Sequence, residues 1–339
     1  MVQYIVKRLF MLVPVLFGVS ILVFLLMRVF SPDPAAIVLG EHASSESIRE
    51  WRESNGLNKP IERQYLDYMR GIFRGDLGNS YYTKSPVIRE LAVRLPATIE
   101  LSLVSIGLAT LFGILFGVLS AIKKNTLIDR TTMVTALLGV SMPVFWTGIL
   151  LIILFAGVLH IFPSSGRIDP LMKPLGGGTG FYLLDTLWVG DFEAFGNTVQ
   201  HIVLPGFTLS LYSLSIITRM TRAGMLESME QDYIRTARAK GLAEGAVIWK
   251  HGFRNTINPV ITVVGLQFGS LLSGAMLTET VFSWPGIGSY TVDAILKSDF
   301  PIVQGSVLIV ALIFVLLNLG VDVIYAFLDP RIKYVDEDN

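Results

Sequence analysis

Six long stretches of this chain contain no Asp, Glu, Lys or Arg. A helix needs about 20 apolar residues to cross the hydrocarbon core of a bilayer, where charges and unpaired backbone groups are costly. Each stretch is long enough for one crossing, and six such runs are not expected of a soluble domain. The stretches are Leu9–Met27, Leu101–Ile122, Thr131–Gly166, Ala194–Thr218, Asn255–Thr278 and Phe300–Val321.

The composition agrees with a membrane protein. Only 16% of the 339 residues are charged, against about 25% in soluble domains. The 27 basic and 27 acidic residues balance, so no net field favours binding of nucleic acid. We therefore expect an all-α integral membrane protein with six transmembrane helices in the lipid bilayer.

The first and third stretches differ from a simple span. The first follows Lys7-Arg8 but is too long for a signal-peptide core and lacks a small-residue cleavage site, so we expect a retained helix within residues 1–30. The third is longer than one crossing needs, and we place its membrane part at Thr132–Leu159. Met142-Pro143 inside it predicts a kink rather than a ligand site.

Lys and Arg in the short loops give the orientation, because cytosolic loops carry an excess of both. Fourteen of them fall on one side and three on the other, which predicts that both termini are cytosolic. The fourteen are Lys7, Arg8, Lys123, Lys124, Arg130, Arg219, Arg222, Arg235, Arg238, Lys240, Lys250, Arg254, Arg331 and Lys333. The three are Arg167, Lys173 and Lys297.

Residues 31–95 form the longest polar segment, with nine basic and nine acidic residues. Its apolar residues recur at near-helical spacing, so we expect an external cap of two or three short amphipathic helices. The remaining chain divides into a five-helix core over residues 96–328, with a cytosolic loop at 219–254, and a cytosolic tail at 329–339.

Residues suited to catalysis are missing from this sequence. There is no cysteine, which excludes disulfides, thiol nucleophiles and Fe–S clusters. The four histidines are scattered, and neither a Walker phosphate loop nor a Gly-x-Ser-x-Gly motif occurs. The glycine-rich run 176–180 lacks the Lys-Ser/Thr that follows a phosphate loop, so we interpret it as an ordinary loop. We expect no metal site, no cofactor in this chain and no enzymatic activity.

The basic loop 219–254 is the most informative cytosolic segment. Met225, Met229, Tyr233 and Ala237 recur every four residues with Ile234 beside them, which predicts one face of a helix. Gly241 stands where a glycine commonly ends a helix with positive φ, and a second helical segment is expected over Glu244–Phe253. Such a unit suits docking into a groove of another protein, or contact between its arginines and anionic lipid.

Five motifs in this sequence resemble the permease subunits of binding-protein-dependent ABC importers, specifically the dipeptide, oligopeptide and nickel branch. The loop motif Asp232–Leu242 resembles the EAA loop of that family. The others, in chain order, are Gly75–Ser80, Ser141–Trp146, Glu279–Gly288 and Asp299–Gly305.

The resemblance implies that the EAA loop is a coupling helix that rests on a cytosolic ATPase. The implied contact residues are Asp232, Tyr233, Ile234, Arg235, Thr236, Ala237, Arg238, Ala239, Lys240, Gly241 and Leu242. It also implies two ATPase subunits that carry ATP and magnesium, a second homologous permease, an extracytoplasmic solute-binding protein, and a place in the cell inner membrane. Three features depart from the family pattern. Arg235-Thr236-Ala237 replaces Glu-Ala-Ala, and Phe253-Arg254 replaces the usual Leu-Pro, with Pro259 later. Ser31-Pro32-Asp33-Pro34 replaces the Pro-Gly-Asp-Pro that often follows the first span.

The resemblance implies ATP-driven alternating access, with this chain forming half of a path for di- and oligopeptides. Nickel or metal chelates and oligosaccharides are the alternative solutes within the branch. From another class, an ion-driven carrier would usually keep ionisable groups near the midplane, and here such groups lie near span ends.

Polar residues inside the apolar spans are candidates for the translocation path, because a polar group in hydrocarbon needs a partner. Hydrogen bonding between helices is the alternative role. The candidates are Ser141, Thr147, Gln267, Ser270, Ser273, Glu279, Asn318 and Asp322. Gly113 and Gly117 form a GxxxG pattern, which predicts close helix packing.

Overall fold

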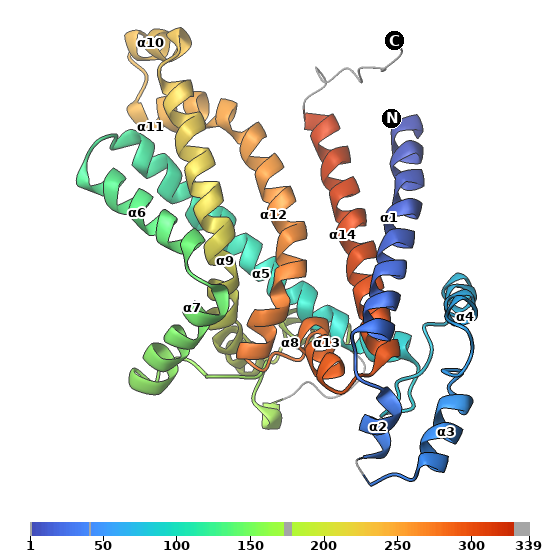
Figure 1. Cartoon of the computed structure of the whole chain (residues 1–339). Coiled ribbons are helices and arrows are strands. Elements are labelled where there is room, and N and C mark those ends of the chain that lie inside the picture. Colours follow the sequence, from blue (N-terminus) through green and yellow to red (C-terminus); the bar gives the residue numbers. More distant parts are fainter. Residues whose placement is uncertain (1, 41, 173–177, 329–339) are drawn as a thin grey trace.

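The computed structural model describes residues 2–40, 42–172 and 178–328, with side chains except at 2–9, 322 and 324–328. This part of the chain is helical and contains no strand, which confirms the all-α prediction (Figure 1). The α-helices are α1 (Val2–Val29), α2 (Pro34–Leu39), α3 (Ser45–Ser54), α4 (Ile61–Phe73), α5 (Val87–Ile122), α6 (Leu127–Ser141), α7 (Val144–Leu151), α8 (Tyr182–Val189), α9 (Phe192–Met229), α10 (Asp232–Ala239), α11 (Glu244–Ala246), α12 (Arg254–Val281), α13 (Ile287–Leu296) and α14 (Phe300–Leu328). Two π-helices, η1 (Ile152–Val158) and η3 (Val247–Phe253), and a 3₁₀ turn, η2 (Pro170–Met172), complete the set.

Five helices are long and apolar enough to cross a membrane, and the bent pair formed by α6 and α7–η1 makes a sixth. The pair bends by 110° at Met142-Pro143. Met142 has an extended backbone, with ψ 133°, because the proline ring disfavours a helical conformation in the residue before it. The predicted kink is therefore confirmed, and it divides the stretch expected in the membrane, Thr132–Leu159, into two helical parts that meet at a sharp bend.

Helix α5 begins fourteen residues before the predicted span at Leu101. The charges that ended the predicted span are neutralised within the fold. Arg94 pairs with Glu90 at 2.7 Å and stacks 3.7 Å from the ring centroid of Tyr290. The predicted boundary between cap and core, at residue 95, therefore falls inside one continuous helix.

Helices α5 and α9 pack closely along the GxxxG pattern. A Cβ added at Gly113 would lie 2.8 Å from Ile217, and one added at Gly117 would lie 2.5 Å from Thr221. The two glycines therefore let the helices approach more closely than larger residues would. This confirms the predicted packing role.

Three helices, α2 to α4, connect α1 to α5, in agreement with the two or three short helices expected for the cap. Asp33 caps α2 through the backbone N–H of Ala35 and also binds Arg52 of α3. Trp51 of α3 packs edge-on against Tyr81, with ring centroids 5.0 Å apart. The cap is thus tied to the core by side-chain contacts as well as by the chain.

The molecule has two distinct ends. Helix α10 stands at one end, on the same side as the start of α1 and the end of α14 (Figure 1). Helices α2, α3, α8 and α13 gather at the opposite end, which we call the far end. The five long spans run between them, so the loop 219–254 and the cap helices α2 and α3 lie at opposite ends of the molecule.

Candidate functional site

Helix α10 and the turn after it form the most exposed helical feature at its end of the molecule. Ile234 and Ala237 are buried against Val247 and the half-buried Met229, which fixes one face of α10 to the protein. The opposite face is exposed within the described part of the chain. The exposed residues of the segment are Asp232, Tyr233, Arg235, Thr236, Arg238, Ala239, Lys240, Gly241 and Leu242.

The predicted four-residue periodicity crosses two helices instead of one. Helix α9 ends at Met229, and α10 begins at Asp232 after an extended Gln231. The reason is local: Ser228 at the end of α9 bonds both the Tyr233 hydroxyl, at 2.7 Å, and the Gly252 carbonyl, at 2.9 Å. These bonds fold α10 back over η3, so Met225 and Ala237 are buried on separate helices.

Gly241 ends the exposed segment with φ +73°, as predicted for a helix-terminating glycine. No other atom lies within 4 Å of a Cβ built there, so backbone conformation rather than space selects glycine. Arg238 and Glu244 pair across the turn at 2.7 Å. The Arg238 side chain is only slightly buried, and the Glu244 carboxylate beside its guanidinium raises the pKa of Arg238. The expected second segment, Glu244–Phe253, is present as α11 and η3.

A buried carboxylate joins three helices beneath this segment. Asp129, in the first turn of α6, accepts two bonds from Arg222 of α9, at 2.7 and 2.9 Å. It also accepts a 2.5 Å bond from Ser120 of α5 and one from the Asn125 backbone N–H. Sequence reasoning missed this group, because Asp129 and Arg222 lie 93 positions apart and follow no shared pattern.

The translocation-path candidates on α12 divide into two groups. Ser270 and Ser273 are exposed on the side of α12 that faces away from the other described helices, and Ser270 bonds only its own helix, at Leu266 O. Gln267 is half-buried and accepts a 3.1 Å bond from Ser213 of α9. Two of these residues therefore point out of the chain, and the third connects helices.

Glu279 lies at the far end and is fully buried. Its carboxylate accepts a 2.6 Å bond from the Thr98 hydroxyl of α5 and a 2.9 Å bond from the backbone N–H of Ser289, in the first turn of α13. The indole of Trp284 donates to the Ala97 carbonyl at 2.9 Å. Glu279 thus holds α5, α12 and α13 together, which is a structural task.

The other path candidates lie in α6, α7 and α14. Ser141 and Thr147 flank the 110° bend, and each bonds a carbonyl of its own helical turn. Asn318 Oδ1 is buried against Gly269 of α12 and has no hydrogen-bond partner within the described part of the chain. Asp322 belongs to α14, but its side chain lies outside those described.

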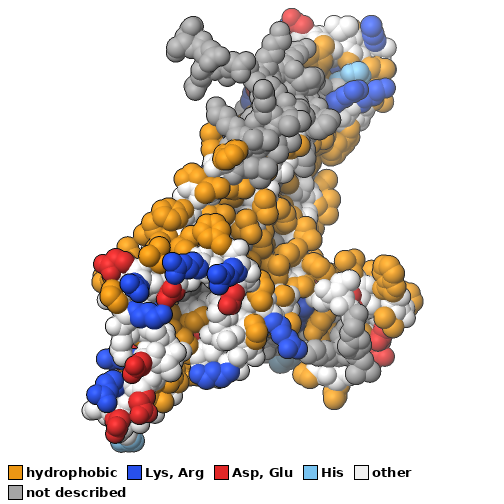
Figure 2. Space-filling model, turned by 90° about the vertical axis from the view of Figure 1, so that its right-hand side faces the viewer, with side chains coloured by type: hydrophobic (Ala, Val, Ile, Leu, Met, Phe, Trp, Pro, Cys, Tyr) orange, Lys and Arg blue, Asp and Glu red, His pale blue; other side chains and the backbone are white. Residues whose placement is uncertain are grey.

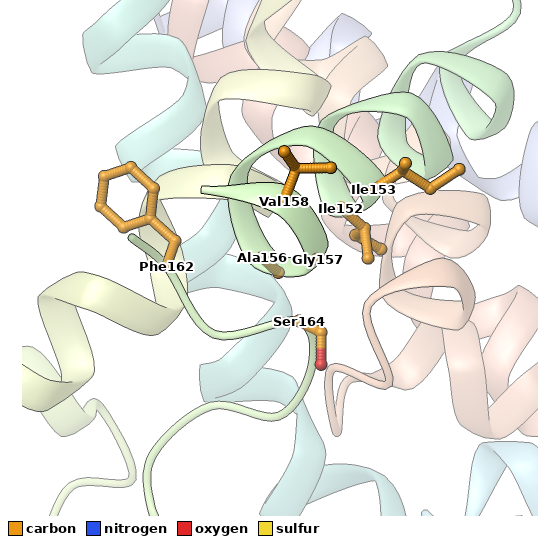
Figure 3. A pocket seen from close by; sticks show the side chains of 7 residues that line it. All are labelled: Ile152, Ile153, Ala156, Gly157, Val158, Phe162 and Ser164. Carbon is orange, nitrogen blue, oxygen red and sulfur yellow. The ribbon is translucent and has the colours of Figure 1, made fainter. Parts of the chain in front are cut away.

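One cavity of about 570 Å³ opens beside η1 (Figure 3). It is lined by Ile152, Ile153, Ala156, Gly157, Val158, Phe162 and Ser164, so its wall is apolar and carries no charged group. Within residues 2–40, 42–172 and 178–328, no group of three His, Asp or Glu is placed to hold a metal ion. Among the predicted glycine run, Gly178 to Gly180 are described, and the backbone N–H groups of Thr179 and Gly180 bind Asp185 of α8. The other two glycines lie outside the described residues.

These features define a helical membrane protein with several spans and one exposed helical turn between two of them. The chain belongs to the family of binding-protein-dependent transport system inner membrane components, which matches residues 113–334, while the N-terminal region of that family matches residues 1–102.

Full-length relatives are named as permeases for small peptides. The chain is 45% identical over 334 residues to the dipeptide transport system permease protein DppB of Alkalihalophilus pseudofirmus, covering 98% of this chain and 100% of the relative. It is 44% identical to a di/tripeptide transport system permease protein of Pseudomonas aeruginosa, covering 98% and 99%. The dipeptide permease DppB of Escherichia coli is 43% identical, with the same coverage.

Proposed function

We propose that this chain is the permease subunit of an ATP-driven importer and forms half of the translocation path for di- and oligopeptides. The exposed α10 turn at Gly241 is the observation that carries the proposal. It offers a docking surface for another protein in a chain that has no phosphate-binding motif of its own. The names of the relatives, which are similar over nearly the whole chain, support small peptides as the solute.

Energy enters the complex through partners in this proposal. Two cytosolic ATPase subunits bind ATP and magnesium, and one of them receives the segment Asp232–Leu242 in a cleft. Because α10 is held by Ile234, Ala237 and the Ser228 bonds, a push on the exposed face is passed to α9 and, through η3, to α12. Closing of the ATPase pair then moves these helices and switches the path between its two openings.

A second, homologous permease completes the path. Helix α12 presents an exposed stripe that contains both apolar and small polar residues, and serine or threonine hydroxyls gain nothing from facing lipid. We therefore place this stripe toward the second permease and the solute. Its members are Leu266, Ser270, Ser273, Gly274, Leu277 and Thr280. Ser141, Thr147, Gln267, Asn318 and Asp322 are kept as secondary candidates, whereas Glu279 is proposed only as a positioning residue because it is fully buried.

The proposed orientation puts α10 and both termini in the cytosol and the far end outside. The excess of Lys and Arg in the loops on the α10 side supports it. The cap at residues 31–95 then faces the solute-binding protein. The chain lacks cysteine, so single cysteines at Ser45 and Ser165 should react with an impermeant reagent from outside, and one at Glu244 only from inside. Reversed labelling would contradict the orientation.

Uptake into proteoliposomes tests the function directly. The chain is reconstituted with its co-purifying partners and the candidate solute-binding protein, with or without ATP on the ATPase side. We expect ATP-dependent uptake of labelled dipeptide that unlabelled di- and oligopeptides compete for. Uptake by this chain alone under a proton or sodium gradient would contradict the proposal. Competition by nickel chelates or oligosaccharides would instead assign one of these as the transported solute.

The path is tested by single cysteines on α12. A water-soluble thiol reagent should modify Ser270→Cys and Ser273→Cys, and bound peptide should slow the reaction. Leu111→Cys is the matched control, because Leu111 is an exposed residue of α5 within an apolar span. Equal reactivity at all three positions would contradict the assignment.

A further inference from the structure

Cap helix α4 packs against the middle of a membrane span rather than standing beyond it. The Tyr65 and Ser20 hydroxyls lie 2.8 Å apart. The Tyr65 ring packs edge-on against Phe24 and Phe17 of α1, with centroids 5.2 and 6.2 Å away. Tyr68 stacks on Phe24 at 5.8 Å. Phe17, Ser20 and Phe24 occupy successive turns of one face of α1.

The position of these contacts along α1 gives the depth of α4. The apolar span of α1 is Phe10–Val29. Phe24 lies five residues before its end and Phe17 twelve, which correspond to about 8 and 18 Å along the helix. A span of this length is about 30 Å long, so α4 contacts Ser20 and Phe24 in the half that ends at Val29 and reaches Phe17 just past the midpoint. Figure 1 shows α4 beside α1, nearly end-on, so its axis crosses the span.

Two further faces of α4 remain exposed beside the face that contacts α1. Leu66 and Phe73 are seven residues apart and share one face, where they are 53% and 84% exposed. Arg63, Arg70 and Arg74 share the next face, because they are also spaced by seven and four residues, and all three are exposed. Going around α4, the order is therefore a protein contact, a face with Leu66, Phe73 and, in the first turn, the exposed Glu62, and then a basic face.

This order matches a helix that lies in a membrane interface, with an apolar face in the acyl boundary and arginines at the headgroups. Figure 2 looks onto this side of the molecule, where Lys and Arg side chains, with some Asp and Glu among them, lie directly below a broad apolar band. Asp67 on the same helix pairs with Lys59 at 2.7 Å and approaches Arg70 only at 3.5 Å. The arginines thus keep donors for a further anion.

We propose that α4 is an interfacial anchor of the cap, with Leu66 and Phe73 among lipid acyl chains. Arg63, Arg70 and Arg74 bind the phosphates of anionic lipid headgroups. Only the identity of the leaflet rests on the proposed orientation. The lipid contact itself follows from depth, exposure and charge, and it requires no transport.

Spin labels on single cysteines test the immersion of α4. Leu66→Cys and Phe73→Cys are labelled in the assembled transporter in nanodiscs of phosphatidylglycerol and phosphatidylcholine. We expect frequent collision with oxygen and rare collision with a water-soluble nickel chelate. The exposed Glu46→Cys on α3 should show the opposite, and Met69→Cys, beside Ser20, should be shielded from both. Labels at 66 and 73 that behave like the label at 46 would show that this face of α4 lies in water. Labels that behave like the one at 69 would show that another protein covers it. Either result would overturn the proposal.

Lipid selectivity tests the arginines separately. We expect each Arg→Gln change at 63, 70 or 74 to weaken association of spin-labelled phosphatidylglycerol by about fivefold, the effect of one basic residue near an anionic surface. Arg49→Gln on the exposed α3 is the matched control and should have no effect. Equal selectivity in the triple variant and the control would overturn the headgroup contact. Neither measurement depends on the solute, so each stands apart from the proposed function.

Discussion

The far end and the α10 end are joined to the molecule in different ways. At the far end, hydrogen bonds connect distant parts of the chain: Thr98 with Glu279, 181 positions apart, and Ser80 with Asp299, 219 positions apart. The side-chain hydrogen bonds that α10 and η3 themselves make join residues at most 24 positions apart, as Ser228 and Gly252 do, although the neighbouring Glu230 binds Lys124, 106 positions away. The far end therefore closes the fold, whereas α10 is a local unit carried by α9 and α12.

This difference predicts separate roles for the two ends: the far end stabilises the fold, and α10 couples the spans to a partner. Breaking the far end should unfold the protein, because several helices lose a shared buried partner. Changing α10 should leave the fold intact and interrupt the transfer of motion to the spans. Four variants test this separation, and they are ordered by their expected effect on the free energy of unfolding.

Arg167→Leu should have the largest effect. Arg167 is buried, binds Glu100 at 2.5 Å, and lies 3.9 Å from the Tyr182 ring centroid. Its loss leaves the Glu100 carboxylate buried without its cation, which costs about 3–5 kcal/mol. Chemical unfolding in detergent measures this change. Adding Glu100→Leu should restore part of the stability, and a single variant as stable as wild type would show that the far end does not close the fold.

Gly117→Val should have the next effect, because the added side chain meets Thr221 of α9. Overpacking of this kind costs about 1–3 kcal/mol. Gly107→Val is the matched control in the same helix, since a Cβ at Gly107 meets no atom within 4 Å. Thermal unfolding of both variants measures the difference. Equal melting temperatures would mean that α5 and α9 can move apart at Gly117 without a loss of stability.

Gly241→Val should cost only about 1–2 kcal/mol of stability, the strain of a β-carbon at positive φ. Peptide uptake and the stimulation of ATP hydrolysis by solute should nevertheless be lost, because the exposed turn changes direction. Gly245→Val is the control, since Gly245 has negative φ and open space. Gly241→Asn should retain activity, because Asn tolerates this conformation. Normal stimulation in Gly241→Val would contradict the coupling role.

Arg238→Gln should have the smallest effect on unfolding, because its pair with Glu244 is exposed. Comparison with Glu244→Gln then separates two roles of Arg238. If the pair only stiffens the turn, both variants should transport equally, and we expect this result. Lower uptake in Arg238→Gln alone would show that the guanidinium itself contacts the partner. Uptake at matched protein levels is the measurement.

The spans and the turn at Gly241 were predictable because each depends on local sequence. A long stretch without charged residues indicates a membrane span, and the glycine at position 241 indicates a turn that ends a helix. Helix α5 was predicted too short, because the charge of Glu100, which ended the predicted span, is neutralised by Arg167, 67 positions away in the chain. The end of α9 and the start of α10 were predicted as one helix, because the four-residue period of apolar residues continues across Gln231 although the helix does not.

The buried polar groups could not be predicted from pattern alone. Glu279 was assigned to the path because it stands at the end of an apolar run, yet Thr98 and Ser289 give it partners from other elements. Asp129 and Arg222 were missed altogether, because their pairing across 93 positions follows no local pattern. Sequence reasoning names such residues as exceptional, but only the fold shows whether their partners are neighbouring helices or a passing solute.

The packing of α1 has a consequence for biosynthesis. Within the described core, Val23 and Met27 of α1 cluster with Phe300 and Ile302 of α14. The ribosome adds the intervening residues at about 5–20 per second, so α1 stays in the bilayer for roughly 15–50 seconds before that partner exists. The Ser20 hydroxyl does not need α14 as a partner during this interval, because it donates a 2.7 Å hydrogen bond to the Phe17 carbonyl of its own helix. The nascent helix therefore keeps this polar group satisfied even before Tyr65 of α4 and the residues of α14 are made.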